Sequence, residues 1–259
     1  MKKSWIVAVV IASLLFQIGL ASALTSGEAK QAWLSAMQAR ISADAAYKQA
    51  QLDYAANKTP ENDQKVIDNA KTVLGSALNE VEAWLNWKNQ EAKDSDAPAE
   101  LKVKIGNDVE KNLVKITTLR GDVAKIKTRV DVAGVFLKMV GAYVELLTDV
   151  ARNTGAAWVY TGNQIADKTA DYEIKLRTTA NGLVDNTEIL AKLDIAKSQI
   201  DLARTQINAA ETSYKLVILP GTPLVKFAEG NSYLRQVRVN LLAAAGQLQE
   251  SFNLIVSHK

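Results

Sequence analysis

The sequence contains no cysteine, a single histidine and only four prolines among its 259 residues. The absence of cysteine excludes disulfide bonds, thiol nucleophiles and cysteine-ligated zinc or iron–sulfur clusters. Because the one histidine, His258, is the penultimate residue, catalytic triads and metal sites built on histidine are also excluded. The scarcity of proline and glycine, together with abundant alanine, leucine, lysine and glutamine, predicts an all-α fold.

The sequence also lacks the common signatures of enzymes. Glycine-rich phosphate loops, GxSxG and SxxK nucleophile motifs and calcium-binding loops are all missing. Carboxylates that could serve as an acid–base pair fall on expected polar helix faces or turns: Glu80, Glu82, Asp94, Asp96 and Asp149. We therefore expect no enzymatic activity, no catalytic residue, no cofactor and no bound metal.

The first 23 residues have the pattern of a secretory signal peptide. Lys2 and Lys3 precede an apolar run over residues 6–20, and Ala21-Ser22-Ala23 provides a small-x-small cleavage site. The run of fifteen residues is shorter than the roughly 20 needed to span a bilayer, which favours cleavage over an uncleaved membrane anchor. We expect the remaining chain to be secreted or held at the cell surface or in a periplasm-like space.

The chain after the predicted signal peptide is almost neutral. It carries 29 basic and 28 acidic residues, because residues 1–23 hold two lysines and no acidic residue. Nucleic acid binding needs a strong positive field, so we expect no nucleic acid partner. The longest later apolar stretch, residues 132–147, contains Lys138 and Glu145 and is too short to span a bilayer.

Capping residues, prolines and glycines predict where helices begin and end. Thr59-Pro60 and Thr222-Pro223 each place a capping residue before a proline at the first helical position, and Asn181-Gly182 marks a helix end. These signals predict helices over residues 26–57, 60–94, 98–180, 186–218 and 223–256.

The third predicted helix is about twice as long as the others. A heptad pattern runs through it, with a positions at Val109, Ile116, Val123, Val130, Leu137, Val144, Ala151, Trp158 and Ile165, and d positions that include Ile105, Asn112, Leu119, Ile126, Val140 and Leu147. This unbroken pattern favours one continuous helix, although residues 152–155 could instead form a turn. We predict an elongated antiparallel helical bundle with two three-helix units, residues 24–135 and 136–259, that share this central helix.

Two resemblances accompany this prediction. The predicted architecture resembles the tandem three-helix repeats of the spectrin type, which implies a rod but no particular function. Residues 190–193, 195–200 and 232–236 resemble parts of secreted helical coiled-coil proteins of unknown function from archaea.

A row of small residues follows the d positions of the long helix at intervals of seven: Gly134, Gly141, Thr148, Gly155 and Gly162. Glycine inside a helix costs about 0.5–1 kcal/mol relative to alanine, which suggests a packing role for the row. The groove could receive the helix at 186–218 or 223–256, or it could be a surface for self-association or for another helical partner. A simple hinge is a third alternative.

Four apolar side chains and one polar side chain are further candidates for function. Asn112 at a d position resembles the single buried polar residue that sets register in coiled coils. Trp84 and Trp87 flank Leu85, so one of them should face outward and contact a partner, or else cover a hairpin tip. The apolar run from Leu216 to Leu219 before Pro220 could touch a partner or a membrane, or close the end of a bundle.

These features predict a non-enzymatic structural or interaction protein of the cell exterior that acts through helix–helix contacts. The partner is expected to be another protein or a second copy, with a weaker indication of a membrane surface. The alternative is an extracellular module whose amphipathic helices bind lipid or another apolar ligand.

Overall fold

The computed structural model describes residues 24–257, and within this range it contains helices and no β-strand. The helices are α2 (Leu24–Ala56), α3 (Pro60–Asp94), α4 (Ala99–Ala124), α5 (Arg129–Ala180), α6 (Thr187–Lys215) and α7 (Pro223–Ser257). The prediction of an all-α bundle is confirmed. The predicted signal peptide and His258 lie outside the described residues.

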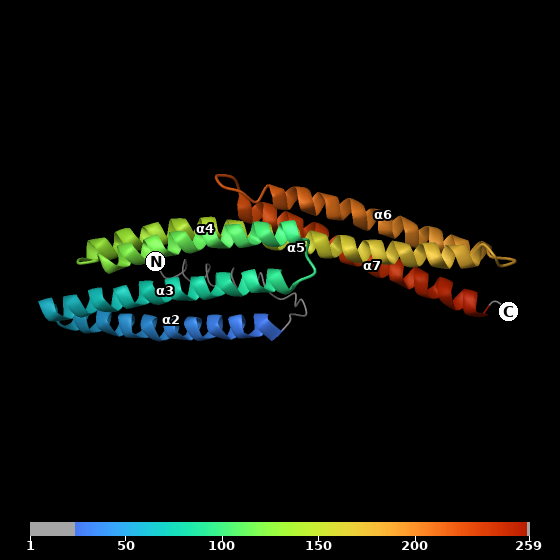
Figure 1. Ribbon diagram of the computed structural model, residues 1–259. Coiled ribbons are helices and arrows are strands. Elements are labelled where there is room, and N and C mark those ends of the chain that lie inside the picture. Colours follow the sequence, from blue (N-terminus) through green and yellow to red (C-terminus); the bar gives the residue numbers. More distant parts are fainter. Residues whose placement is uncertain (1–23, 258–259) are drawn as a thin grey trace.

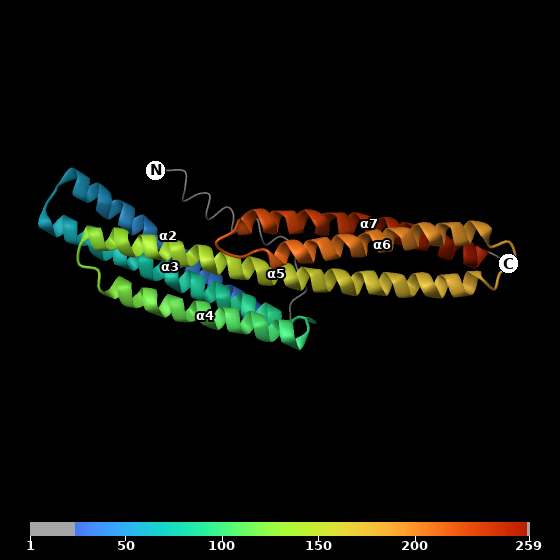
Figure 2. The same cartoon turned by 90° about the horizontal axis from the view of Figure 1, so that it is seen from above.

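The helices form an elongated molecule made of two antiparallel bundles (Figure 1). One bundle contains α2, α3, α4 and the N-terminal half of α5, and the other contains the C-terminal half of α5 with α6 and α7. The 52 residues of α5 extend over about 78 Å at 1.5 Å per residue. The view from above shows α5 running through both bundles (Figure 2).

The predicted continuous helix over residues 98–180 is wrong, because the chain reverses at residues 125–128 between α4 and α5. The Thr128 side chain accepts a hydrogen bond from the backbone N–H of Asp131 at 3.2 Å, and the Asp131 carboxylate accepts one from the backbone N–H of Thr128 at 2.8 Å. This reciprocal capping box starts α5. The alternative turn at residues 152–155 is also wrong, since these residues lie inside α5.

The predicted heptad seam is correct along α4 and fails in the first half of α5. On α4 the seam residues Ile105, Val109, Asn112, Ile116, Leu119 and Val123 are all buried, and Ile126 is buried in the turn. Beyond the turn, Val130 is 81% exposed and Leu137 is 69% exposed. The reversal presents a different face of the chain to α4, so the residues that continue the pattern in sequence point away from the first core.

The two bundles have separate hydrophobic cores that meet near residue 150. The residues of α5 that pack in the first core end at Val150, and Ala151 belongs to the second core. A further cluster, which includes Leu176, Leu193 and Leu248, closes the far end of the second bundle. The predicted boundary at residue 135 is therefore wrong by about four helical turns, and the first unit has four helical segments rather than three.

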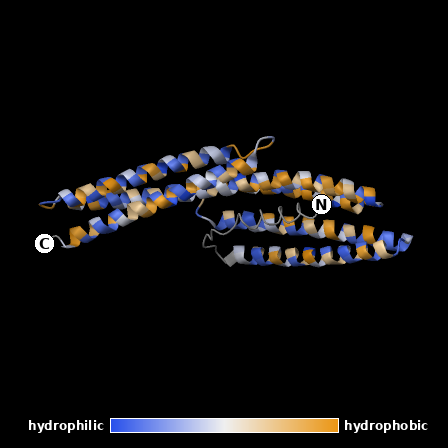
Figure 3. Cartoon of the chain, turned by 180° about the vertical axis from the view of Figure 1, so that it is seen from behind, coloured by the Kyte–Doolittle hydropathy of each residue, from blue (hydrophilic) through white to orange (hydrophobic). Residues whose placement is uncertain are grey.

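Helix α2 is attached mainly to α3. Among the apolar residues of α2 whose side chains the structure describes, only the small Ala43 and Ala50 are buried, while Leu52 is exposed. An ion pair between Arg40 and Glu80 joins the two helices, and the rings of Trp33 and Trp87 stack with their centroids 5.0 Å apart. Figure 3 shows polar residues frequent along α2. None of the described helices has an apolar stretch long enough to cross a membrane.

Candidate interaction site

The N-terminal half of α5 has two opposite apolar faces. Val135 and Leu146 point into the first core. At 100° per residue, the opposite face contains seven residues, and each is exposed and is either aliphatic or glycine. We call these residues the α5 stripe: Val130, Ala133, Gly134, Leu137, Val140, Gly141 and Val144.

The α5 stripe continues into the surface that α6 and α7 cover. One turn after Val144, the same face of α5 presents Thr148 and then Ala151, and both are buried. The Thr148 hydroxyl donates a hydrogen bond to the Val144 carbonyl oxygen at 2.8 Å, so its polar group is satisfied within the helix. A single helix face is therefore covered by two helices along its C-terminal half and open along its N-terminal half.

The covered half is packed most closely at Gly155. A β-carbon on Gly155 would overlap the ring of Tyr214 of α6, and a β-carbon on Gly230 of α7 would lie 2.6 Å from the same ring. Tyr214 is buried between the two glycines, and its hydroxyl donates a hydrogen bond to Asn231 Oδ1 at 2.6 Å. Burial raises the pKa of the Tyr214 phenol above its usual value of about 10.

The predicted row of small residues divides into two groups. Gly155 and Gly162 face α6, and a β-carbon on Gly162 would meet Ile207 at an ordinary 3.5 Å. A β-carbon on Gly134 or Gly141 would have no neighbour within 4 Å. The second pair is therefore open, and nothing in the described part of the chain packs into the groove that it forms.

Exposed apolar side chains also gather where α6 connects to α7. Val217 is fully buried in the second core, whereas Leu216 and Leu219 are 47% and 41% exposed. The connection lies beside α5 in both ribbon views (Figures 1 and 2), close to the place where the two bundles meet. Figure 3 shows the apolar start of this connection. It adds to the open apolar surface at the C-terminal end of the α5 stripe.

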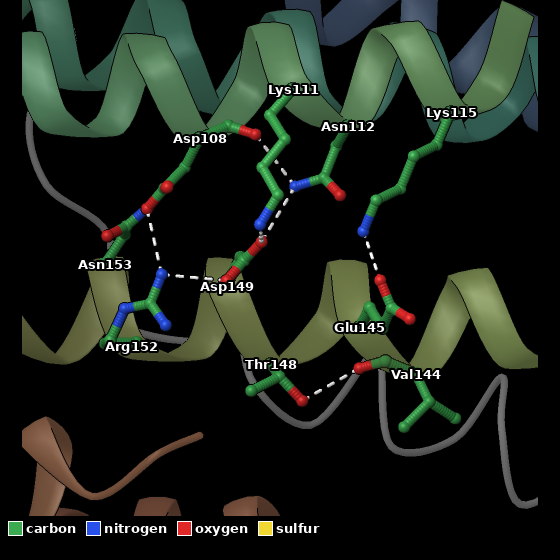
Figure 4. A network of polar contacts seen from close by, with 10 residues as sticks. All are labelled: Asp108, Lys111, Asn112, Lys115, Val144, Glu145, Thr148, Asp149, Arg152 and Asn153. Atoms are coloured by element: carbon green, nitrogen blue, oxygen red, sulfur yellow. Dashed lines mark hydrogen bonds and ion pairs between the residues drawn. The ribbon is translucent and has the colours of Figure 1, made fainter. Parts of the chain in front are cut away.

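A buried polar network joins α4 to α5 between the two cores (Figure 4). Asn112 Nδ2 donates to Asp149 Oδ2 at 3.2 Å, and one guanidinium nitrogen of Arg152 donates to Asp149 Oδ1 at 2.8 Å and to Asp108 Oδ2 at 3.0 Å. Asn153 Nδ2 also donates to Asp108 Oδ2 at 3.0 Å. Asp149 is therefore buried and paired, which corrects the expectation that it lies on a polar face.

Asn112, the predicted register residue, is the most buried member of this network. It fixes α4 against α5 because a shift by one turn would separate its amide from Asp149. The sequence signal for Asp108, Arg152 and Asn153 is weak, since none of them occupies an a or d position of the heptad pattern. Their role depends on the reversal at residues 125–128, which brings α5 back along α4.

The prediction of an exposed tryptophan near the end of α3 is wrong. Trp84 and Trp87 are 8% and 6% exposed, respectively. The Trp87 ring stacks on Trp33 of α2 on one side, and Lys88 Nζ lies 3.7 Å from its centroid. Helix α2 covers the face of α3 that bears Trp87, and the sequence pattern of α3 alone does not indicate this contact.

The charged residues that flank the α5 stripe are already paired within the chain. Lys138 Nζ lies 2.8 Å from Asp122 Oδ2, and Glu145 forms an ion pair with Lys115. These hydrogen bonds from lysine lower the pKa values of Asp122 and Glu145 below their usual range. The edge of the stripe therefore carries balanced charge rather than a field of one sign.

The described residues contain no cluster of three or more acidic or histidine side chains placed to hold a metal ion. Comparisons of the chain with protein families, with curated proteins and with solved structures found no match. The α5 stripe and the adjoining connection between α6 and α7 form the candidate functional surface.

Proposed function

We propose that this chain is a non-enzymatic structural protein of the cell exterior that joins other components through helix–helix contacts. The observation that carries the proposal is the α5 stripe: seven consecutive face positions without a polar residue, open to solvent, on an elongated two-bundle body. Exposed aliphatic rows of this kind mark interaction surfaces, because they are costly to leave in water. Secretion follows in this proposal from the pattern of residues 1–23.

The site-specific test is photo-crosslinking in the cells that produce the protein. A photoreactive amino acid at Leu137, in the middle of the α5 stripe, should give adducts of protein mass. The same amino acid at Lys175, which is exposed in the second half of α5, is the matched control and should give few adducts. Equal yields at the two positions, or none at Leu137, would refute the interaction surface.

Binding of lipid or another apolar ligand is the second candidate function. It is favoured by the exposed Leu216 and Leu219 and by the small apolar contact that holds α2, which could let that helix move away. A pocket of about 140 Å³ between α4, α5 and α6 is lined by charged side chains such as Lys104 and Glu211, and it is too small for an acyl chain. Organic extraction of the purified protein separates the two functions: a carrier releases lipid, and the interaction protein does not.

A further inference from the structure

We infer that the α5 stripe binds the α5 stripe of a second copy, with the two helices antiparallel about a two-fold axis at Leu137. This inference rests on the proposed function and names its partner. An interface between identical chains about a two-fold axis needs a surface that is complementary to itself. The order of residues along the stripe meets this condition.

The stripe is nearly symmetric about its centre. With Leu137 opposite its counterpart in an antiparallel copy, Val130 faces Val144, Gly134 faces Val140 and Gly141 faces Ala133. Each glycine therefore lies opposite an aliphatic side chain that can fill its groove. A β-carbon at Gly134 or Gly141 would have no neighbour within 4 Å in the single chain, so both grooves are available.

The same face of α5 already forms a helix–helix interface of this type. Along residues 148–180 it packs against α6 and α7, with Tyr214 seated over Gly155 and Ile207 over Gly162. The α5 stripe continues this interface toward the N-terminus, and the one polar group between them, the Thr148 hydroxyl, is satisfied within the helix. A helix from a second copy would thus lie in line with the hairpin of α6 and α7.

The surroundings of the stripe favour an uncharged helical occupant. Lys138 and Glu145 are held by Asp122 and Lys115 of the same chain, so neither of these two charges is free to select an acidic or basic partner. The connection between α6 and α7 lies at the C-terminal end of the stripe (Figure 2), where the turn before α5 of the second copy would approach it. Leu216 and Leu219 would then be covered as well.

The first test is the solution mass of the full chain, measured by light scattering from about 1 to about 100 µM, the range that separates weak from stable association. We expect twice the chain mass, and Leu137→Glu should weaken association at least tenfold. Leu242→Glu, which changes a similarly exposed leucine on α7, is the control and should keep the dimer. Circular dichroism melts of both variants exclude unfolding as the cause, since both side chains are solvent-exposed.

The second test uses the absence of native cysteine, which makes introduced cysteines unambiguous. With a short bis-maleimide, Leu137→Cys should crosslink to itself. Val130→Cys mixed with Val144→Cys should form the mixed dimer, whereas Val130→Cys alone should form few dimers. Crosslinking of Val130→Cys to itself with no mixed dimer would overturn the antiparallel arrangement.

Other outcomes distinguish this inference from the proposed function. A monomeric protein whose Leu137 still crosslinks to a different protein in cells overturns the second copy and leaves the interaction function standing. A monomer without crosslinks at Leu137 overturns both. Flotation with phosphatidylcholine vesicles that is lost in Leu137→Glu would assign the stripe to a membrane instead.

Discussion

The ring of Tyr214 occupies the space that a side chain on Gly155 would need, so α5 and α6 approach each other there only because residue 155 has no β-carbon. Gly230 makes the same allowance from α7. The Tyr214 ring of α6 therefore packs between α5 and α7, at the end of the second core that is nearer to the first bundle. The covered face of α5 becomes the α5 stripe close to this point.

We expect Gly155→Ala to lower the free energy of unfolding by about 1–3 kcal/mol, since the added methyl group must displace a buried ring. Gly162→Ala is the control on the same helix face, because its β-carbon would meet Ile207 at an ordinary distance of 3.5 Å. That variant should be neutral or up to about 1 kcal/mol more stable through helix propensity. Urea unfolding measures the stability of both variants, and an equal change in the two would contradict the close packing of the Tyr214 ring on Gly155.

The stability of the protein should fall as the pH rises above about 10. Burial raises the pKa of Tyr214 in the folded protein, so the unfolded chain loses this phenolic proton first and deprotonation favours unfolding. Burial raises the pKa of Tyr143 in the same direction. In Tyr214→Phe, the free energy of unfolding, measured by urea titration, should therefore fall less steeply between pH 9 and 11 than in the wild type. The double variant with Tyr143→Phe should show a still shallower fall.

A Tyr214→Phe protein would also lack the donor for Asn231 Oδ1. We expect it to be less stable than the wild type near pH 7 by about 1 kcal/mol. If its stability instead declined with pH as steeply as that of the wild type, burial of the Tyr214 phenol would have no part in alkaline unfolding.

Removing the cation that bridges the two carboxylates of the network between the two cores should destabilise the protein. Arg152→Met leaves Asp108 and Asp149 close to each other without their shared partner, and we expect a loss of about 2–3 kcal/mol. Arg204→Met is the matched control, because Arg204 pairs with Asp167 at a similar distance on an exposed surface. That change should cost less than about 1 kcal/mol by urea unfolding, and a larger cost would argue against a special role for the network.

The reversal before α5 should depend on its cap. Thr128→Ala removes the side-chain acceptor for the Asp131 backbone N–H, and we expect a loss of about 1 kcal/mol in thermal or urea unfolding. Thr117→Ala makes the same chemical change in the middle of α4, where alanine is the better helix former, and should cause no loss. Hydrogen exchange should become faster in the first turn of α5 in Thr128→Ala alone.

Local signals in the sequence were sufficient for most helix ends. Thr59-Pro60 and Pro223 begin α3 and α7 as predicted, because a capping side chain and a fixed proline φ act within one turn of chain. The spacing of Thr128 and Asp131 carries the same kind of signal for α5. This capping signal was missed because the apolar heptad pattern continues through the reversal, with Ile126 buried inside the turn itself.

The two-sided character of α5 could not be derived from its pattern. A heptad count assigns one buried seam to a helix, and Leu137 and Val144 belong to that seam in sequence although they are exposed in space. Which face of α5 is buried depends on where α4 and α6 end. The positions of these two helices along α5 are a property of the tertiary arrangement. The open part of the small-residue row, Gly134 and Gly141, could be distinguished from the closed part only after that arrangement was known.

The sharing of α5 between two cores has a consequence for how this chain can be divided. Truncation anywhere within residues 129–180 removes part of α5 from one bundle and exposes the aliphatic core of that bundle to water. The two halves are therefore poor candidates for separate expression, for shuffling into other proteins or for insertion of a tag inside α5. A tolerant position for such engineering is the short link before Pro60, which leaves every helix whole.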